Sequence, residues 1–369
     1  MVLPKDIDKI HSIQLETTSR CNLDCTTCLK PVYGSHWIER DLDLSLFRRI
    51  LDQLPPKISV HLQGWGEPLL HPDTLEHIRE LKAKGFTVSF TTNGSIMDRS
   101  MAEALIDSKL DCLTFSMAGN SSQIQDRLRG VGSFDNLLKS IRLFNTLRSE
   151  RKSTATMIAV SYLLTPETVL QLPGAVSWCR SNGVDEFVSV HLTQAACKNQ
   201  EERQFLLSEK EAKKYRLLRI QTQMNALFGR MKVELGQFQP ILTPVCTKNP
   251  INTLFISANG DVSPCVFLCP PVDEKIPWRY RGDKYLQKPL VFGNVQTAPL
   301  TEIWKQAEYC RFRNAFKRRK EFHDSRLSGI SCSLTGSAQL DASVAAIKHF
   351  FSENPPPKSC RYCAKMDGY

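Results

Sequence analysis

Short apolar runs alternate with longer stretches of helical periodicity in the first half of this chain, between residues 12 and 192. The apolar runs have the length and bounding turns of strands. They are Ser12–Thr17, Ile58–Leu62, Phe86–Thr91, Cys112–Ser116, Met157–Leu163 and Phe187–His191. The stretches between them predict helices at Leu44–Leu54, Thr74–Ala83, Ser100–Ile106, Phe134–Leu147 and Pro166–Arg180. Strand–helix alternation builds a parallel sheet, so six units predict an α/β fold, a (βα)6 partial TIM barrel.

Polar residues gather where the predicted strands end. These ends carry Thr17-Thr18, Gln63-Gly64, Thr92-Asn93, Ser116 and His191. The carboxyl ends of parallel strands lie at one edge of a sheet, where βα folds place their chemistry. We therefore expect one shared site above the sheet, with the first strand leading directly into a cysteine-rich loop.

The pattern changes after residue 195. Ser208 and Glu211 form a capping box that predicts a helix to about Phe228. Beyond Pro240 the chain holds seven of its thirteen cysteines. We predict three regions: the barrel at 10–195, a linker helix region at 196–239, and a small cysteine-rich α+β domain at 240–369. The segment Ser325–Pro357, rich in Gly, Ser and Pro, is predicted to be a loose insertion.

Composition narrows the classes of function. With 41% hydrophobic and 23% charged residues, the chain has the make-up of a globular protein. It shows no signal-peptide run and no membrane-spanning stretch, so we expect a cytoplasmic protein. Thirteen cysteines in that compartment indicate metal ligands rather than disulfides. The net charge of +10 allows an acidic partner, but the basic run Arg311–Lys320 is predicted to be a solvated helix face, which does not favour nucleic-acid binding.

Cys21, Cys25 and Cys28 stand at the spacing Cys-x3-Cys-x2-Cys. A cubane 4Fe–4S cluster usually takes four thiolates. Three thiolates would leave one iron open to another ligand, and an open metal position distinguishes a catalytic site from a closed structural one. The alternative is a zinc knuckle completed by a distant ligand such as His36.

This triplet is the signature of the radical S-adenosylmethionine (radical SAM) superfamily, which the chain resembles from about residue 10 to 195. The resemblance implies that SAM chelates the open iron and is reductively cleaved. The resulting 5′-deoxyadenosyl radical would abstract a hydrogen from the substrate. The family's Gly-Gly-Glu-Pro element corresponds to Gly64-Trp-Gly-Glu-Pro68, which implies that Gly64, Gly66 and Glu67 bind the SAM amino group. Trp65 departs from the pattern.

Further strand ends carry the resemblance. Asn93 matches a ribose-contacting turn, Ser116 a serine that contacts SAM, and Arg129 an arginine that pairs with a carboxylate. Without the family resemblance, Asn93 would be interpreted as part of an ordinary Asn-Gly turn, and Arg129 as a member of a surface ion pair. Ala118 replaces an expected Asp, and Thr27 an expected aromatic residue. Leu29 and Trp37 are then candidates for the adenine contact. His191 could touch the substrate or be purely structural.

A second set of cysteines lies in the C-terminal region. Asn259-Gly260 between apolar runs predicts a hairpin that brings Cys246 and Cys265 together. Cys360-x2-Cys363 would complete four thiolates. With Phe292-Gly-Asn-Val and a helix at Leu300–Trp304 capped by Thr301, the region resembles the SPASM/twitch extension of radical SAM enzymes. That resemblance implies one auxiliary 4Fe–4S cluster and leaves over Cys269, Cys310 and Cys332. A structural zinc ribbon is the alternative.

The leading hypothesis is a radical SAM oxidoreductase or maturase. It would abstract a hydrogen from a peptide or small molecule and pass a second electron to the auxiliary cluster. The outcome would be oxidation or crosslinking. Flavodoxin or ferredoxin would serve as electron donor. The alternatives are a cofactor-maturation enzyme of the same family and a non-catalytic iron–sulfur or zinc scaffold.

Overall fold

The computed structural model describes residues 9–151, 156–227, 229–328 and 336–369. Its centre is a ten-stranded sheet in the order β12-β9-β8-β1-β2-β3-β4-β5-β6-β7. The strands are β1 Ser12–Leu15, β2 Ser59–Leu62, β3 Thr87–Thr92, β4 Cys112–Met117, β5 Met157–Leu164, β6 Glu186–His191, β7 Lys232–Glu234, β8 Thr253–Ile256, β9 Asp261–Ser263 and β12 Gly293–Asn294. Strands β1 to β6 pair in parallel and in sequence order, which confirms the six predicted strands.

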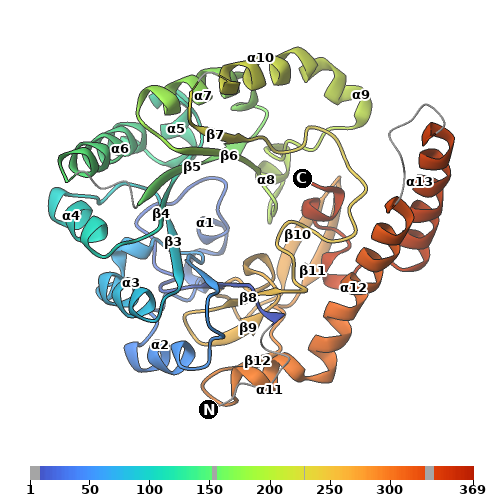
Figure 1. Ribbon diagram of the computed structural model, residues 1–369, viewed down its shortest axis with the longest axis horizontal. Helices are drawn as coiled ribbons and strands as arrows, with labels where there is room; N and C mark the ends of the chain where they lie inside the picture. The colour runs from blue at the N-terminus through green and yellow to red at the C-terminus, as the bar shows by residue number, and fades with distance from the viewer. Residues whose placement is uncertain (1–8, 152–155, 228, 329–335) are drawn as a thin grey trace.

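Helices cover the outer side of this curved sheet (Figure 1). They are α2 Leu44–Leu51, α3 Thr74–Ala83, α4 Arg99–Asp107, α5 Ser122–Arg129, α6 Ser133–Glu150 and α7 Leu172–Ser181. The predicted helices are present apart from their ends, while α5 was not predicted. Helix α7 begins at Leu172 rather than Pro166, because Thr165–Gln171 forms a turn and Pro173 fits only the first helical turn. The architecture is the predicted parallel α/β fold.

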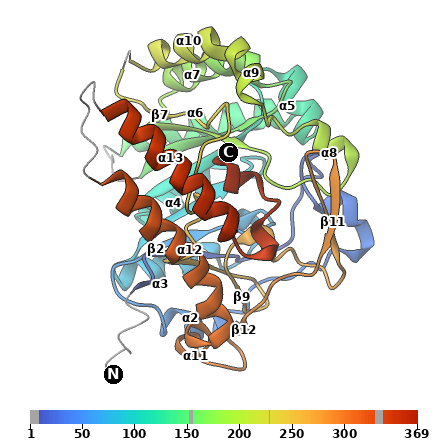
Figure 2. The same cartoon turned by 90° about the vertical axis from the view of Figure 1, so that its right-hand side faces the viewer.

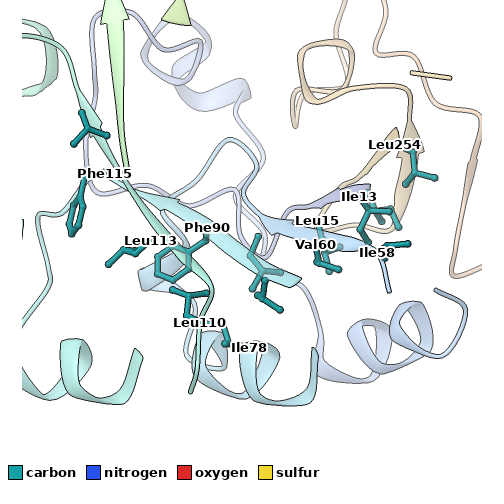
Figure 3. Close-up of a cluster of buried hydrophobic side chains, with 14 of the residues drawn as sticks. Ile13, Leu15, Ile58, Val60, Ile78, Phe90, Leu110, Leu113, Phe115 and Leu254 are labelled. Carbon is teal, nitrogen blue, oxygen red and sulfur yellow. The ribbon is translucent and has the colours of Figure 1, made fainter. Parts of the chain in front are cut away.

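The core lies between the sheet and these helices. Figure 3 shows Val60, Phe90 and Leu113 of neighbouring strands packed with Ile78 of α3. These side chains are fully buried. Burying one such apolar side chain contributes about 1.5–3 kcal/mol. The sheet is thereby held rigidly enough to position loops at its carboxyl edge.

The linker region adds short helices and one strand. They are α8 Lys198–Glu202, α9 Glu209–Ala212 and α10 Arg216–Leu227, with a 3-10 turn at Lys213–Tyr215. The predicted capping box is present: the Ser208 hydroxyl accepts from the Glu211 N–H, and the Glu211 carboxylate accepts from the Ser208 N–H. Strand β7 then pairs in parallel with β6.

The C-terminal region continues the same sheet. The predicted Asn259-Gly260 hairpin joins β8 to β9, and β8 pairs in parallel with β1, Ser12 facing Thr253. A separate hairpin is formed by β10 Ile276–Tyr280 and β11 Asp283–Gln287. The domain boundaries at 195 and 239 stay a prediction, since the sheet runs through all three regions.

Two sequence expectations about the C-terminal helices need correction. Helix α11 Leu300–Lys305 begins after Pro299, and the Thr301 side chain does not cap it. The segment predicted to be loose contains α13 Gly336–Glu353, which packs on α12 Ala307–Leu327 through the stacked rings of Phe322 and Phe350, 3.9 Å apart. The apolar side of α13 packs against α12, and this contact could not be predicted from the composition of the segment. Cys332 lies outside the described residues.

The basic run Arg311–Lys320 lies on α12, mostly exposed as predicted. Arg319 is the exception. It is buried and donates to the backbone oxygens of Pro244, Asn354 and Thr243. Among the helices that the structure describes, none is both long and apolar enough to cross a membrane.

Candidate active site

A cavity of about 300 Å³ opens at the carboxyl ends of the parallel strands. Its wall contains the sequence-predicted residues Cys21, Cys25, Cys28, Gly64, Gly66, Glu67, Asn93, Ser116, Arg129 and His191. They come from four different strand ends, from the last residue of helix α5 and from the cysteine loop. Apart from Trp37, one of the two candidates for the adenine contact, the structure therefore brings together every residue predicted for the first cofactor site.

The turn after β2 is held against the cysteine loop by close backbone contact. A Cβ on Gly66 would lie 2.3 Å from the Thr18 backbone oxygen, and one on Gly64 would lie 2.2 Å from Glu16 Oε1. The Glu67 N–H also donates to the Arg20 oxygen at 2.8 Å. Only glycine fits such an approach. Both glycines are thus required for the position of the turn.

Glu67 joins two strand-end loops. Its carboxylate is buried and accepts hydrogen bonds from the Thr92 hydroxyl at 2.8 Å and from the Asn93 N–H at 2.7 Å. The Leu69 N–H donates to it at 3.2 Å. Burial raises the pKa of Glu67 to about 7, against these hydrogen bonds and the charge of Arg129, which lower it. Most of its acceptor capacity is used within the protein, so Glu67 positions the cavity wall.

Asn93, Ser116 and Arg129 differ in how much of each side chain is free. Asn93 donates to Asn22 Oδ1 of the cysteine loop at 3.0 Å and accepts from the Ser95 N–H. The Ser116 hydroxyl has no hydrogen-bond partner among the described residues. Arg129 Nε is buried without a partner within the same part of the chain. Ser116 and Arg129 therefore keep polar atoms available for a ligand.

His191 lies in the wall with its ring held by aromatic neighbours. Its Nδ1 lies 3.0 Å from the Phe205 carbonyl oxygen, and the ring stacks on Phe205 and meets Tyr369 edge-on. Burial and the charge of Lys365 lower the pKa of His191 to about 4. The ring is neutral near pH 7, with Nε2 buried and unpartnered among the described residues.

The two candidates for the adenine contact separate. Leu29 lies in the cavity wall. Trp37 is not part of that wall: its indole N–H donates to the Ser19 oxygen at 3.0 Å and its ring packs edge-on against Trp65. Trp65 in turn donates to the Cys269 oxygen at 3.2 Å and meets Phe267 edge-on. The departure at Trp65 thus connects the turn to the C-terminal region.

Sequence reasoning missed Gln194 and Lys248 in the cavity wall. Gln194 follows β6 and is 3% exposed, with both amide atoms unpartnered among the described residues. Its place three residues after a strand end could have revealed it. Lys248 comes from the C-terminal region, 3.4 Å from Gln14 Oε1, and burial lowers its pKa to about 8. Only the fold brings Lys248 to this cavity.

The C-terminal cysteines Cys246, Cys265, Cys360 and Cys363 lie within range of one another's charges. Burial comes first in raising the pKa of Cys360 well above its usual value, and the charges of the other three add to it. Burial, followed by the charge of Cys246, also raises the pKa of Cys265 to about 11. None of the twelve cysteines in the described part of the chain forms a disulfide.

Comparison with protein families follows the two cysteine sets. Residues 15–172 match the radical SAM superfamily, and residues 246–327 match SPASM, an iron–sulfur cluster-binding domain. The chain belongs to the radical SAM superfamily. It is a radical SAM enzyme with a SPASM-type domain, and its cofactors at family level are SAM and iron–sulfur clusters in both regions.

Relatives of this radical SAM enzyme carry varied activities. A tungsten-containing aldehyde ferredoxin oxidoreductase cofactor-modifying protein of Pyrococcus furiosus is 28% identical over 315 residues, 82% of each chain. A probable GTP 3′,8-cyclase of Sulfurisphaera tokodaii is 28% identical over 50% of this chain and 56% of its own. The pre-heme d1 synthase of Dinoroseobacter shibae is 26% identical over 48% and 42%. Except for the first, the chain spans about half the length of these relatives.

Solved structures share the fold. Native anSMEcpe with bound AdoMet and Cp18Cys peptide aligns with a TM-score of 0.61 and 18% identity over 93% of this chain and 97% of that one. Streptococcus suis SuiB bound to S-adenosylmethionine gives 0.60 and 16% identity over 82% and 68%. Both support the partial-barrel architecture.

The donor sets of this radical SAM enzyme fit their expected groups. The three front thiols lie in one wall with the unpartnered Arg129 Nε, which suits a carboxylate. His36 is absent from that wall, and its Nδ1 instead lies 3.0 Å from Glu274. Within the described ranges, no three Cys, His, Asp or Glu side chains gather tightly enough to ligate a single metal ion. A cubane spreads its thiolates over separate irons, so its ligands stand farther apart than those of one zinc.

Proposed function

We propose that this enzyme cleaves SAM with an electron from a cluster held by Cys21, Cys25 and Cys28, and then abstracts a hydrogen from a peptide or small-molecule substrate. When bound, the cluster and SAM supply the radical. The observation that carries the proposal is the single cavity whose wall includes the three thiols, the strand-end polar groups and C-terminal residues next to Cys246 and Cys265.

The residues of the wall have distinct roles in this proposal. Gly64, Gly66 and Glu67 hold the turn in place for the methionine end of SAM. The free Arg129 Nε would bind its carboxylate, and Asn93 and Ser116 would contact the ribose and the remaining polar edge. The cavity shape orients the ligand relative to the thiols and excludes bulk water.

We also propose that Cys246, Cys265, Cys360 and Cys363 hold one auxiliary 4Fe–4S cluster that accepts the second electron. Burial raises the pKa of Cys246, and the charges of Lys365 and Lys248 partly oppose this rise and so favour the thiolate there. The cavity reaches this region through Lys248, Val266 and Phe267. A two-electron oxidation or crosslink is the outcome, with flavodoxin or ferredoxin as the one-electron donor.

Cofactor modification is the second candidate for the outcome. The Pyrococcus furiosus relative is named for it and matches 82% of each chain, which favours this reading among small-molecule substrates. It uses the same cavity and the same first step. Assay of substrates after the SAM-cleavage test separates the two outcomes.

The test is formation of 5′-deoxyadenosine by anaerobically purified protein with SAM and dithionite. We expect the product from the wild type, and none from the Cys21→Ala, Cys25→Ala, Cys28→Ala triple variant, because the electron source is lost. Iron should fall from about eight to about four per chain in that variant. Product formation and iron are both measured on the same preparations.

A matched control removes three cysteines outside both sets: Cys112→Ala, Cys197→Ala and Cys310→Ala. This variant should keep the product and about eight irons per chain. Formation of 5′-deoxyadenosine by the Cys21→Ala, Cys25→Ala, Cys28→Ala variant would contradict the proposed cluster site. If the wild type contained zinc in place of about four irons, the C-terminal cysteines would hold zinc and the proposal would lose its electron acceptor. The proposed SAM site would be unaffected.

A further inference from the structure

A second, larger hollow of about 840 Å³ lies in the C-terminal region, and we call it the β11 groove. It is lined by β11, by one face of α12 around Phe312, and by the segment from Pro357 to Tyr362. It shares no lining residue with the candidate active-site cavity. Figure 2 shows β11 at the right-hand side of the view, away from the large sheet.

The edge of β11, rather than one of its faces, borders the groove. The consecutive residues 284–288 all line it. Four of these five residues belong to β11. Successive side chains of a strand point to opposite faces, so four consecutive strand residues can line one hollow only along the strand's edge. Within the described part of the chain, the two-stranded sheet pairs β11 with β10 alone, and no strand pairs with the other edge of β11.

The hairpin register identifies the unpaired backbone groups. Arg281 and Gly282 form its two-residue turn, both with positive φ (52° and 92°), the pattern of a type I′ turn. Tyr280 and Asp283 flank this turn and face each other. In such hairpins the flanking pair exchanges hydrogen bonds and every second pair follows. Lys284 and Leu286 therefore direct N–H and C=O groups outward, and neither has a backbone bond outside the hairpin among the described residues.

Apolar surface and positive charge surround this edge. Leu286 is 63% exposed, and the Tyr285 ring stacks on Tyr362 with centroids 3.5 Å apart. Lys284, Lys288 and Lys358 are exposed at the rim and have no ion pair within the described residues.

Two acidic side chains lie near this rim. Glu308 pairs with Arg311 at 3.5 Å, and Asp283 accepts from the Tyr285 hydroxyl. The lysines therefore leave the rim with excess positive charge. An unpaired strand edge with apolar flanks and this excess suits an extended acidic segment.

We propose that the β11 groove binds an extended, acidic peptide segment by strand addition to β11. The backbone of the segment bonds to Lys284 and Leu286, its apolar side chains enter the groove, and its carboxylates face the three lysines. This inference deepens the proposed function, because it names a peptide as the substrate class. It rests on the proposed function only in the claim that the bound peptide is also the substrate that reacts. Peptide binding needs no turnover, so the binding proposal and the proposed function can fail independently of each other.

The test uses the anaerobic holoenzyme and a fluorescein-labelled peptide that alternates glutamate with valine. Anisotropy should show binding that weakens with added salt, since the rim charges are exposed. The variant Lys284→Glu, Lys288→Glu, Lys358→Glu should bind the peptide with an affinity at least about tenfold lower than that of the wild type. Hydrogen exchange should show new protection of the Lys284 and Leu286 amides. SAM cleavage with dithionite is measured in parallel and should be unchanged.

Controls separate strand addition from general attraction of charge. The variant Lys210→Glu, Lys213→Glu, Arg216→Glu makes the same charge change on exposed residues of α9, of the 3-10 turn after it and of α10, and should bind as the wild type does. Leu286→Pro removes one outward N–H that the hairpin does not use, and should lose binding that Leu286→Ala largely keeps.

Equal binding of a lysine–valine peptide, or equal loss in the α9–α10 variant, would overturn the proposal. So would unchanged exchange at Lys284 and Leu286. Binding of an acidic flavodoxin through the same lysines, without peptide binding, would also overturn it and make the surface a docking site for a redox protein.

Discussion

Glu16 shows at the residue scale how a single buried carboxylate joins three parts of the chain. It is 1% exposed and accepts from the Trp65 N–H at 2.8 Å and from the Ala258 N–H at 3.1 Å. It also occupies the space that a side chain at position 64 would need. The residue looks like an ordinary strand-end acid in the sequence, since both donors are distant along the chain.

Burial raises the pKa of Glu16 and of Glu67 from 4.5 to about 7. The folded chain thus binds these protons more tightly than the unfolded chain does. Their contribution to the free energy of unfolding is full below pH 4.5 and is lost as pH rises to about 7. We expect the free energy of unfolding, measured with urea, to decline less steeply between pH 4.5 and about 7 for Glu16→Gln than for the wild type.

Glu16→Gln should also lower the free energy of unfolding by about 1–3 kcal/mol near pH 7, because an amide N–H₂ replaces one acceptor opposite a backbone donor. The exposed Glu209→Gln provides the control and should leave both the slope and the stability unchanged. Identical pH slopes for Glu16→Gln and the wild type would contradict the assignment.

At the scale of elements, the turn Gly64–Pro68 combines a family pattern with a local departure. Its glycines were predicted from the resemblance, and the structure supplies the reason in the contacts with Thr18 and Glu16. The Trp65 ring meets Trp37 at 5.9 Å and Phe267 at 6.4 Å. The third residue comes from the region after β9, so no local pattern could have predicted the contact.

We expect Trp65→Gly to lower the free energy of unfolding by about 3–5 kcal/mol, because it removes a packed aromatic ring. Trp65→Phe keeps most of the packing and loses the bond to the Cys269 oxygen, so it should cost about 1 kcal/mol. Anaerobic chemical denaturation measures both variants. Equal losses in the two would show that the hydrogen bond, not the packing, stabilises the turn.

Helix α13 is the element for which sequence composition was misleading. Gly, Ser and Pro around it resemble a loop, yet Phe350 stacks on Phe322 of α12 and the Asn354 oxygen accepts from Arg319. Figure 1 shows α12 and α13 side by side at the right of the view. A helix stabilised by tertiary packing needs little intrinsic propensity.

The whole molecule is organised by one sheet that crosses the predicted domain boundaries. Strand β1 lies between β2 and β8, so the first barrel strand has a neighbour from the C-terminal region. Ile13 and Leu15 of β1 and Ile256 of β8 are all buried in one core. The C-terminal region therefore completes the barrel as well as carrying the second cysteine set.

A chain ending at residue 239 should be insoluble or unfolded, because it exposes the edge and the apolar side chains of β1. Circular dichroism and sedimentation of the truncated chain measure this. Co-expression of residues 240–369 should restore soluble protein, since it returns β8. A soluble, native-like fragment alone would contradict the structural dependence.

The sequence by itself determined the parallel α/β fold, the two cysteine sets and the family, because periodicity and close spacing are local properties of a chain. It also named the strand-end residues that line one cavity, since parallel strands end at a common edge. Tertiary structure alone decided the joining of β8 to β1, the contacts of Glu16 and Trp65, the place of Lys248 in the cavity and the free edge of β11. Each of these depends on residues distant in sequence meeting in space, and neither propensity nor spacing carries that information.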